Sequence, residues 1–478
     1  MKIDTKHPSQ GTCHTPIFKK KCPSIMSSSP TSVDTPQAEL RLQWSNPGDI
    51  LSLLLLVGGD IVQAALAQLV GIGIPIASRR SLILITPVAF SFGWVAYAFT
   101  SLISIVGDNK LMPEPDSASI IVNCSNAFAR ENHSWILSRL LRDHEASHEV
   151  DRNEVSIRVD IFEARGDDPV PDVDRIWVIG WLVIVVQQVL AVIPWILYGD
   201  WAIFMVTVGG TASALLTGAL PQWVEEKWPR QRINPGKRKV VALTRGNGHP
   251  HVLVIVNDGK GWDFEALATA AGSSRSETRF ILTLLTIWWT MLLITVSGLH
   301  QHTWFLIGVG GLGMLQNIYA AGATRSAGAF NIHLEPYSPC PTIVGYRQAS
   351  AVKAVDEPNS EEDPDDNVGE DSPWASNIAP GVMGALMKLE KELPKAGASL
   401  LSVFFPGGLK YEEERFKFNR EKKFWKRAFR RMGKPVPRRS TTTVSSGPTE
   451  DAPEQSDSNS EDFAGGSGST APAIAVKL

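Results

Sequence analysis

Six apolar stretches constrain this chain more than any other feature of its sequence. A helix that crosses the hydrocarbon core of a bilayer needs about 20 mostly apolar residues. The stretches that meet this requirement cover residues 51–77, 82–106, 176–198, 201–220, 280–299 and 303–321. Short links at 78–81, 199–200 and 300–302 join them in pairs. The sequence therefore predicts an α-helical membrane bundle of six transmembrane helices, arranged as three hairpins.

The composition changes sharply between these hairpins and the rest of the chain. We expect nine segments: a disordered tail (1–48), the first hairpin (49–106), a cytosolic α/β loop (107–175), the second hairpin (176–220), a cytosolic β-hairpin with a helix (221–279), the third hairpin (280–321), an acidic linker (322–378), amphipathic and basic-aromatic helices (379–435) and a disordered tail (436–478). The net charge of -3 argues against nucleic-acid binding, and four cysteines in 478 residues exclude a disulfide-built scaffold.

Basic residues near the ends of the apolar stretches predict the orientation of the chain. Six spans place both termini and the two long loops on one side, which carries Arg41, Lys110, Arg175, Lys227, Arg230, Arg232, Arg275, Arg279 and Arg325. The other side offers only Arg79 and Arg80. Because Lys and Arg concentrate in cytoplasmic loops, we expect an integral membrane protein with cytosolic termini and long loops. The glycosylation sequons at Asn123 and Asn132 cannot be used on this topology.

The two long loops carry the patterns of strands and helices. In the first loop, 119–123 and 155–161 predict strands and 134–148 predicts a helix. In the second, strands over 239–244 and 251–256 form a hairpin, and 262–271 predicts a helix. An isolated hairpin is only marginally stable in water. We therefore expect the two loops to meet and form one small cytosolic α/β domain.

Acidic and basic segments follow each other after the last apolar stretch. The acidic residues between 357 and 371, in a segment rich in turn formers, are typical of a disordered linker. A helix over about 411–431 places Phe418, Trp425, Phe429 and Met432 on one stripe. The rest of its surface is basic: Lys422, Lys423, Lys426, Arg427, Arg430 and Arg431. Such a helix suits the anionic headgroups of a cytosolic leaflet; a nuclear-localisation-like patch or a docking helix are the alternatives.

Asp60 is a candidate functional residue within the apolar stretches. On a helix, Asp60 and Gln63 share a face, and Gln68 lies beside it. A carboxylate near the centre of a bilayer costs about 3 kcal/mol, so we expect this face to point into the bundle. It would serve either as a proton or ion site or as a hydrogen-bonding partner for Gln187, Gln188, Gln316 or Asn317.

His144, Glu145 and His148 form an H-E-x-x-H pattern in the helix predicted over 134–148. In metalloproteases, two histidines one turn apart bind zinc and the glutamate activates a water molecule. A third ligand could come from Asp167 or Asp168. Charged residues flank the pattern on both sides, whereas zinc-binding helices are mostly buried and apolar. The alternative is therefore the charged end of an amphipathic helix, and we expect neither a metal nor a cofactor.

An ordered set of short motifs extends from about residue 50 to residue 430. It comprises 59–63 (GDIVQ), 90–94 (FSFGW), 199–203 (GDWAI), 218–223 (GALPQW), 243–248 (LTRGNG), 304–306 (WFL), 310–317 (GGLGMLQN) and 404–407 (FFPG). In this set the chain resembles a family of uncharacterised multi-pass integral membrane proteins of filamentous fungi. The resemblance implies a shared bundle and cytosolic domain. It implies no activity, and the family pattern lacks the zinc-like histidine pair.

The sequence thus favours a membrane-embedded binding or regulatory protein over an enzyme. Its expected partners are the lipid bilayer and, at the basic helix, anionic lipid headgroups. Two alternatives remain: a small-solute or proton carrier that uses Asp60, and a zinc hydrolase that uses His144, Glu145 and His148.

Overall fold

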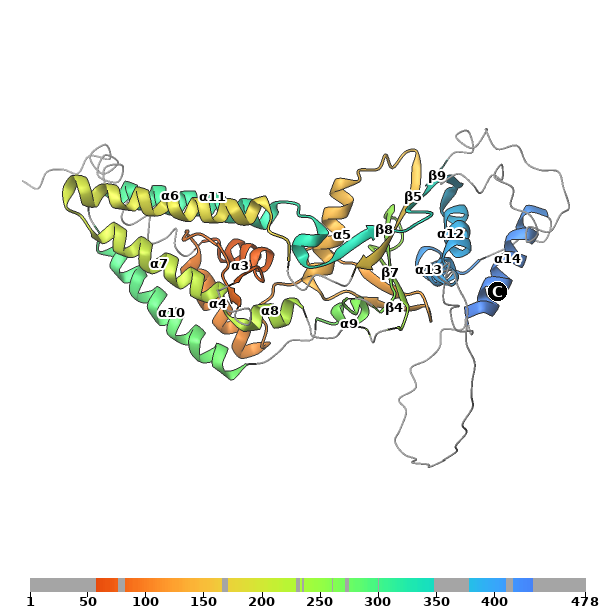
Figure 1. Cartoon of the computed structure of the whole chain (residues 1–478), viewed down its shortest axis with the longest axis horizontal. Coiled ribbons are helices and arrows are strands. Elements are labelled where there is room, and N and C mark those ends of the chain that lie inside the picture. Colours follow the sequence, from red (N-terminus) through yellow and green to blue (C-terminus); the bar gives the residue numbers. More distant parts are fainter. Residues whose placement is uncertain are drawn as a thin grey trace, which may run out of the picture. The chain divides into compact units, whose positions relative to one another are not determined.

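The computed structural model describes residues 57–75, 82–165, 171–228, 233, 236–259, 261–270, 275–299, 301–347, 378–409 and 416–432. The expected tails at 1–48 and 436–478 lie outside these residues, as do 348–377 of the expected linker. Within them the chain is a mixed α/β protein with an eight-stranded sheet (Figure 1). The prediction of a six-helix membrane bundle is therefore wrong.

Four long apolar helices form one part of the fold: α6 (Arg175–Tyr198), α7 (Ala202–Gly218), α10 (Ser276–Ser297) and α11 (Thr303–Gly322). By length and composition, α6, α10 and α11 could each cross a membrane. A fourth span results if α7 is counted with α8 (Pro221–Lys227), which follows it after a bend of 43°. These helices form two hairpins, α6–α7 and α10–α11, whose tips are in contact: the His302 ring stacks on the Tyr198 ring with centroids 4.2 Å apart.

The other two expected spans are interrupted. The described part of the stretch 51–77, residues 57–75, forms the 11-residue helix α3 (Gly59–Leu69), followed by β1 (Gly73–Pro75). The stretch 82–106 contains β2 (Leu82–Leu84), an irregular segment over 85–93, which we call the buried segment, and α4 (Trp94–Gly107). Gly71 and Gly93 have φ values of +108° and +97°, which break a helix, and Pro87 lacks a backbone donor. Glycine and proline therefore stop two apolar stretches from becoming long helices.

The buried segment lies among α6, α7 and α11. Buried backbone outside regular structure needs hydrogen-bond partners, and side-chain amides of the long helices supply them. Gln187 Nε2 donates to Phe90 O at 2.6 Å, and Asn317 Nδ2 donates to Ala89 O at 3.3 Å. Gln316 Oε1 accepts from Ala89 N at 3.3 Å. Gln187, Gln316 and Asn317 thus bind irregular backbone, whereas Gln188 Nε2 donates to Thr211 Oγ1 of α7 at 3.1 Å.

Glycines on the long helices make room for the buried segment. A Cβ at Gly313 would overlap the Phe90 carbonyl, and one at Gly310 would overlap the Phe92 ring. The other three glycines of α11, Gly308, Gly311 and Gly322, have nothing within 4 Å of such a Cβ. Two glycines of α11, Gly310 and Gly313, therefore pack closely against the buried segment.

The second part of the fold is the sheet, with strand order β10-β9-β5-β7-β6-β3-β4 and with β8 also paired to β5. The strands are β3 (Ile120–Asn123), β4 (Phe128–Glu131), β5 (Val155–Arg165), β6 (Lys239–Thr244), β7 (His251–Asn257), β8 (His333–Pro336), β9 (Thr342–Tyr346) and β10 (Ile378–Pro380). The central pair β5 and β7 is parallel, and β7 pairs antiparallel with β6.

Both faces of the sheet are covered at its centre, so the central strands β6 and β7 are apolar on both sides. Leu253 and Ile255 of β7 belong to the apolar cluster that also contains α5 (Trp135–Ser147) and α9 (Phe264–Leu267). Val252 and Val254 belong to the cluster on the other face. That face carries α12 (Gly381–Glu392), α13 (Ala396–Phe404) and α14 (Phe416–Met432). The C-terminal helices are therefore part of the sheet's core.

The strands predicted in the two long loops do pair with each other. Ile121 of β3 pairs with Leu243 of β6, and Val159 of β5 with Val252 of β7. The sheet extends further than expected, because the residues predicted to begin the acidic linker form a 3-10 helix (Ala327–Phe330), β8 and β9. These strands cover one edge of β5, whose backbone groups would otherwise be unpaired.

Candidate functional site

Three buried cationic side chains lie where the apolar helices meet the sheet. We call this group, Arg139, Lys227 and Arg325, the junction. The last carbonyls of a helix lack partners within the helix and carry partial negative charge, which favours cations. Lys227 Nζ donates to Gln68 O at 3.1 Å and to the Val70 carbonyl at 2.9 Å, at the end of α3. Cations of the junction thus cap α3.

The other two members of the junction extend this capping. Arg325 Nη1 also donates to the Gln68 carbonyl, and Arg139 Nη2 donates to the Ala321 carbonyl near the end of α11. Asp174 lies 2.6 Å from Arg325 Nε, and Asp116 lies 2.9 Å from Arg139 Nη1. Each arginine therefore joins a helix end to a carboxylate, and the junction holds the two parts of the fold together.

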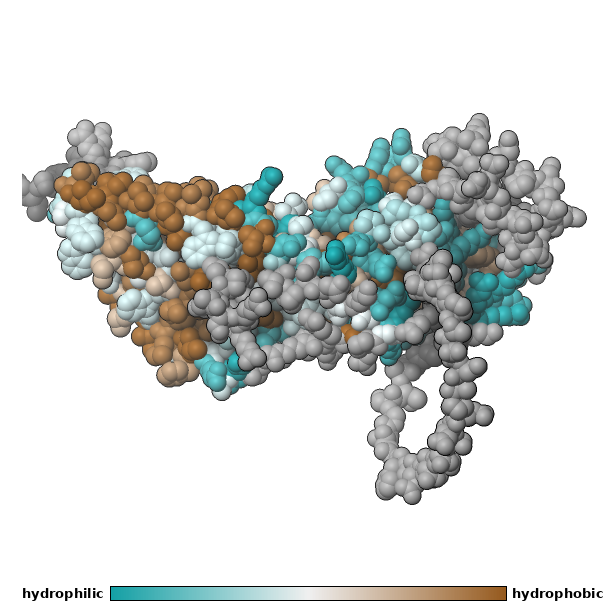
Figure 2. Space-filling view, viewed as in Figure 1, coloured by the Kyte–Doolittle hydropathy of each residue, from teal (hydrophilic) through white to brown (hydrophobic). Residues whose placement is uncertain are grey.

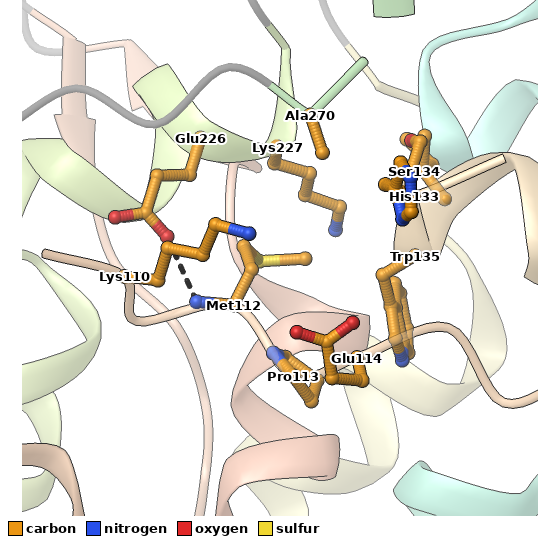
Figure 3. A pocket seen from close by; sticks show the side chains of 11 residues that line it. Lys110, Met112, Pro113, Glu114, His133, Ser134, Trp135, Glu226, Lys227 and Ala270 are labelled. Atoms are coloured by element: carbon orange, nitrogen blue, oxygen red, sulfur yellow. Dashed lines mark hydrogen bonds between the residues drawn. The ribbon is translucent and has the colours of Figure 1, made fainter. Parts of the chain in front are cut away.

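A small pocket adjoins the junction (Figure 3). It is lined by Lys110, Met112, Pro113, Glu114, His133, Ser134, Trp135, Ile136, Glu226, Lys227 and Ala270. Glu226 Oε2 accepts from the backbone N–H groups of Leu111 and Met112, both at 2.8 Å. The carboxylate of Glu226 and the amine of Lys227 are thus both bound to backbone groups.

The remaining charged groups of the pocket have opposite signs. Figure 3 shows the amines of Lys110 and Lys227 and the carboxylate of Glu114 facing the same space. Glu114 and His133 are exposed, and Lys110 is half-buried. These groups can bind a small polar or charged molecule by hydrogen bonds. A general base needs a substrate proton within hydrogen-bond reach. Among the residues that line this pocket, no serine or cysteine is paired with a histidine as an activated nucleophile would be.

His144 and Glu145 lie in the last turn of α5, and His148 is the residue that caps its C-terminus. His144 Nε2 is 2.9 Å from Asp160 Oδ2, and Glu145 pairs with Arg245 at 2.6 Å. The His144 and His148 rings are 4.4 Å apart. In the part of the chain that the structure describes, no three His, Cys, Asp or Glu side chains lie together as metal ligands would. The candidate ligands Asp167 and Asp168 lie outside the described residues.

Asp160 lies at the centre of a polar cluster with His144, Arg158 and Thr342. From the sequence, the alternation of β5 indicates only that Asp160 shares a face of the strand with Arg158. Its carboxylate accepts from Arg158 Nε at 2.8 Å and from Thr342 Oγ1 at 2.7 Å. Burial raises the pKa of this carboxyl, but the hydrogen bonds from His144, Arg158 and Thr342 outweigh it and hold the pKa well below its ordinary value. Asp160 therefore stays ionised and fixes α5 on the sheet.

His251 borders the same cluster and was not singled out for this position by the sequence. It is 7% exposed and lies beside Arg158 in the sheet. Its Nδ1 has no hydrogen-bond partner among the described residues. Burial, together with the positive charge that His144 can carry, lowers the pKa of His251 to about 4. His251 is therefore a neutral histidine at physiological pH.

The intramembrane polar residues proposed from the sequence do not form one face in a bundle. Asp60 lies in the first turn of α3, and its side chain is exposed. Gln63 Nε2 donates to Leu111 O at 2.8 Å, and Gln68 Nε2 donates to Ala323 O at 3.1 Å. The expectation that Asp60 points into the bundle is wrong. Because α3 begins at Gly59, Asp60 lies at the end of a short helix and not in the middle of a long span, and its side chain is exposed there. Both glutamines bind backbone carbonyls.

The basic residues of α14 lie on its solvent face. Lys422, Lys423, Lys426, Arg427, Arg430 and Arg431 are exposed. The apolar stripe faces the protein, because Trp425 is fully buried and its indole Nε1 donates to Met383 Sδ at 3.2 Å. Phe429 and Met432 pack on the same cluster, whereas the side chain of Phe418 lies outside the described residues.

Comparisons with known protein families, with curated proteins and with solved structures find no match. The resemblance to fungal membrane proteins therefore stays an expectation, and the function must be argued from the residues.

Proposed function

We propose that this chain is a multi-pass membrane protein in which α6, α7, α10 and α11 hold the sheet at one membrane surface. The observation that carries the proposal is the apolar outer surface of these helices (Figure 2). On α6 the exposed side chains Val178, Leu182, Val185 and Val189 recur every three or four residues, and Ile196 follows two turns later. On α10 they are Phe280, Leu284, Ile287, Met291 and Ile294.

A contiguous exposed apolar surface of this kind marks a site of protein or membrane interaction. At 1.5 Å per residue, the 24 residues of α6 extend about 36 Å, and the 20 residues of α11 about 30 Å. The hydrocarbon core of a bilayer is about 30 Å thick. A lipid environment accounts for both the length and the apolar surface of these helices.

The arrangement of the strands supports a cytosolic position for the sheet. The strands come from before α6, from between α8 and α10, and from after α11, and they lie in one sheet. The hairpin tips at 199–201 and 298–302 contain no Lys or Arg, whereas Arg175, Lys227, Arg275 and Arg325 lie near the opposite helix ends. By the positive-inside rule, the sheet and the C-terminal helices are cytosolic.

The role that fits this architecture is membrane-attached binding or regulation. The charged groups of the pocket at the junction suit a polar ligand, and the basic face of α14 suits anionic lipid headgroups. The Asp60 side chain is exposed in the first turn of α3, so no observation favours a carrier that uses it. Glu145 is paired with Arg245, which leaves the zinc hydrolase without its general base.

Extraction of membranes tests the proposal. We expect the full chain to remain in the pellet after washes at high salt and at alkaline pH, and to enter the supernatant only with detergent. Peripheral attachment through α14 alone would release the protein at high salt, because exposed charge interactions are screened. Release by alkaline carbonate without detergent would contradict the proposal.

A further inference from the structure

Because one side of α14 packs against the rest of the protein, its basic residues are held on the opposite, solvent-exposed side. Trp425 and Ala428 are buried against the cluster that contains α12 and α13. At the other end of the helix, Lys395 Nζ donates to Met432 O at 3.1 Å. These contacts fix the rotation of α14 about its own axis. Five basic residues of the helix are exposed to solvent, a set that we call the basic face: Lys422, Lys423, Lys426, Arg430 and Arg431.

A segment of opposite charge belongs to the same chain. Residues 356–371 contain nine acidic residues and no basic one: Asp356, Glu357, Glu361, Glu362, Asp363, Asp365, Asp366, Glu370 and Asp371. They belong to the 30 residues between Arg347, just after β9, and Ile378, where β10 begins. Both ends of this stretch are held, because β9 and β10 pair in the sheet.

The point where this segment rejoins the structure lies close to α14. Ile378 precedes by five residues Met383, the residue that binds the Trp425 indole at 3.2 Å. Asp371 precedes Ile378 by seven residues, which extended chain covers in at most about 25 Å. A tether of this length gives an effective concentration in the millimolar range. Weak individual charge pairs can then be occupied together.

We propose that the acidic segment 356–371 docks on the basic face of α14 in the same molecule. Charge complementarity and the short tether both favour this occupant over a separate protein. The docking goes beyond membrane attachment and does not depend on it. It would cover the lysines and arginines that otherwise meet an anionic leaflet.

Zero-length carbodiimide cross-linking of the full chain in neutral detergent tests this docking. We expect amide links from Lys422, Lys423 or Lys426 to Glu357 or Glu370 at low salt, identified by peptide mass spectrometry. At about 1 M salt the Debye length falls to about 3 Å, so these links should decrease at least tenfold. A mixture of isotopically light and heavy protein separates links within one molecule from links between copies.

Matched variants sharpen the test because they retain both cross-linking glutamates. The variant with Glu361→Gln, Glu362→Gln, Asp363→Asn, Asp365→Asn and Asp366→Asn should lose the links to Glu357 and Glu370 about tenfold. The control changes five acids of the C-terminal end and should leave them within twofold: Glu450→Gln, Asp451→Asn, Glu454→Gln, Asp457→Asn and Glu461→Gln. The proposal would be overturned if the links are absent, if both variants lose them equally, or if they join separate copies. It would also be overturned if these lysines are shielded from reaction only when anionic nanodiscs are present.

Discussion

Lys227 shows how a charged side chain can be used as a structural cap. It is 2% exposed, and its amine binds the two carbonyls that end α3. In the sequence it resembles a flanking charge that sets membrane orientation. Its role at the junction depends on α3, which lies more than 150 residues earlier in the chain, so the local sequence carries no sign of it.

Replacing Lys227 should destabilise the protein. Lys227→Met removes the two hydrogen bonds that the amine donates and leaves the Val70 carbonyl without this buried partner, at a cost of about 2–4 kcal/mol. The matched control Lys110→Met changes a half-buried lysine of the same pocket and should cost less than about 1 kcal/mol. Thermal unfolding in detergent measures both. Equal effects of the two substitutions would contradict the capping role.

His251 should make the sheet sensitive to acid. Its pKa of about 4 in the folded chain lies below the ordinary value of about 6.5, so the neutral form stabilises the fold. This contribution is complete above pH 6.5 and is lost as the pH falls towards 4, by about 2 kcal/mol between pH 7.5 and 5. The lowered pKa of Asp160 acts only below about pH 4. His251→Asn should melt with a weaker dependence on pH between 7.5 and 5; an unchanged dependence would exclude His251 as its source.

At the scale of elements, the buried segment is the feature that most changes the fold. Apolar composition alone predicts a span over 82–106, but Pro87 and Gly93 prevent a continuous helix. The resulting irregular backbone is accepted because Gln187, Gln316 and Asn317 supply hydrogen bonds. Irregular backbone at membrane depth is tolerated where it is buried in protein or lines a water-filled cavity.

The glycines of α11 give a direct test of this packing. Gly313→Val should destabilise the protein by about 3 kcal/mol or more, because its side chain would overlap the Phe90 carbonyl. Gly311→Val on the same helix meets nothing within 4 Å of its Cβ and should cost less than about 1 kcal/mol. The yield of monodisperse protein and its melting temperature measure the difference. Similar losses in the two variants would show that the buried segment does not lie against Gly313.

At the scale of the whole molecule, one sheet collects strands from three separated parts of the chain. This arrangement requires the helix ends next to those parts to lie on one side, which the hairpins α6–α7 and α10–α11 achieve. Asn132 in one sequon is 2% exposed, and its amide donates to Ser119 Oγ at 3.0 Å. A glycan at this position would disrupt the sheet region.

The proposed topology therefore predicts opposite behaviour for native and introduced sequons. In a eukaryotic host, Asn123 and Asn132 should carry no glycan. A flexible insert with an acceptor sequon at the tip 199–201 should be glycosylated and lose mass on endoglycosidase treatment. The same insert after Gly246, in the turn between β6 and β7, is the control and should stay unmodified. Glycosylation of the control insert alone would reverse the topology.

Several elements could be predicted because their signals are local. The strand patterns over 155–161, 239–244 and 251–256 located β5, β6 and β7, and helical spacing located α5 and α14. The junction could not be predicted, because Arg139, Lys227 and Arg325 bind carbonyls of distant helices. The apolar stripe of α14 was found, but the sequence could not tell a bilayer from α12 and α13 as the surface that covers it.

The sequence by itself determined which stretches are apolar, where strands alternate, and where charge changes sign along the chain. It did so because hydropathy and periodicity are properties of neighbouring residues. Only the tertiary structure decided that two apolar stretches contain short helices and buried irregular backbone, and that the histidines of α5 bind Asp160 and neighbouring backbone. These outcomes depend on hydrogen-bond partners and packing surfaces that lie up to about 250 residues away in the chain.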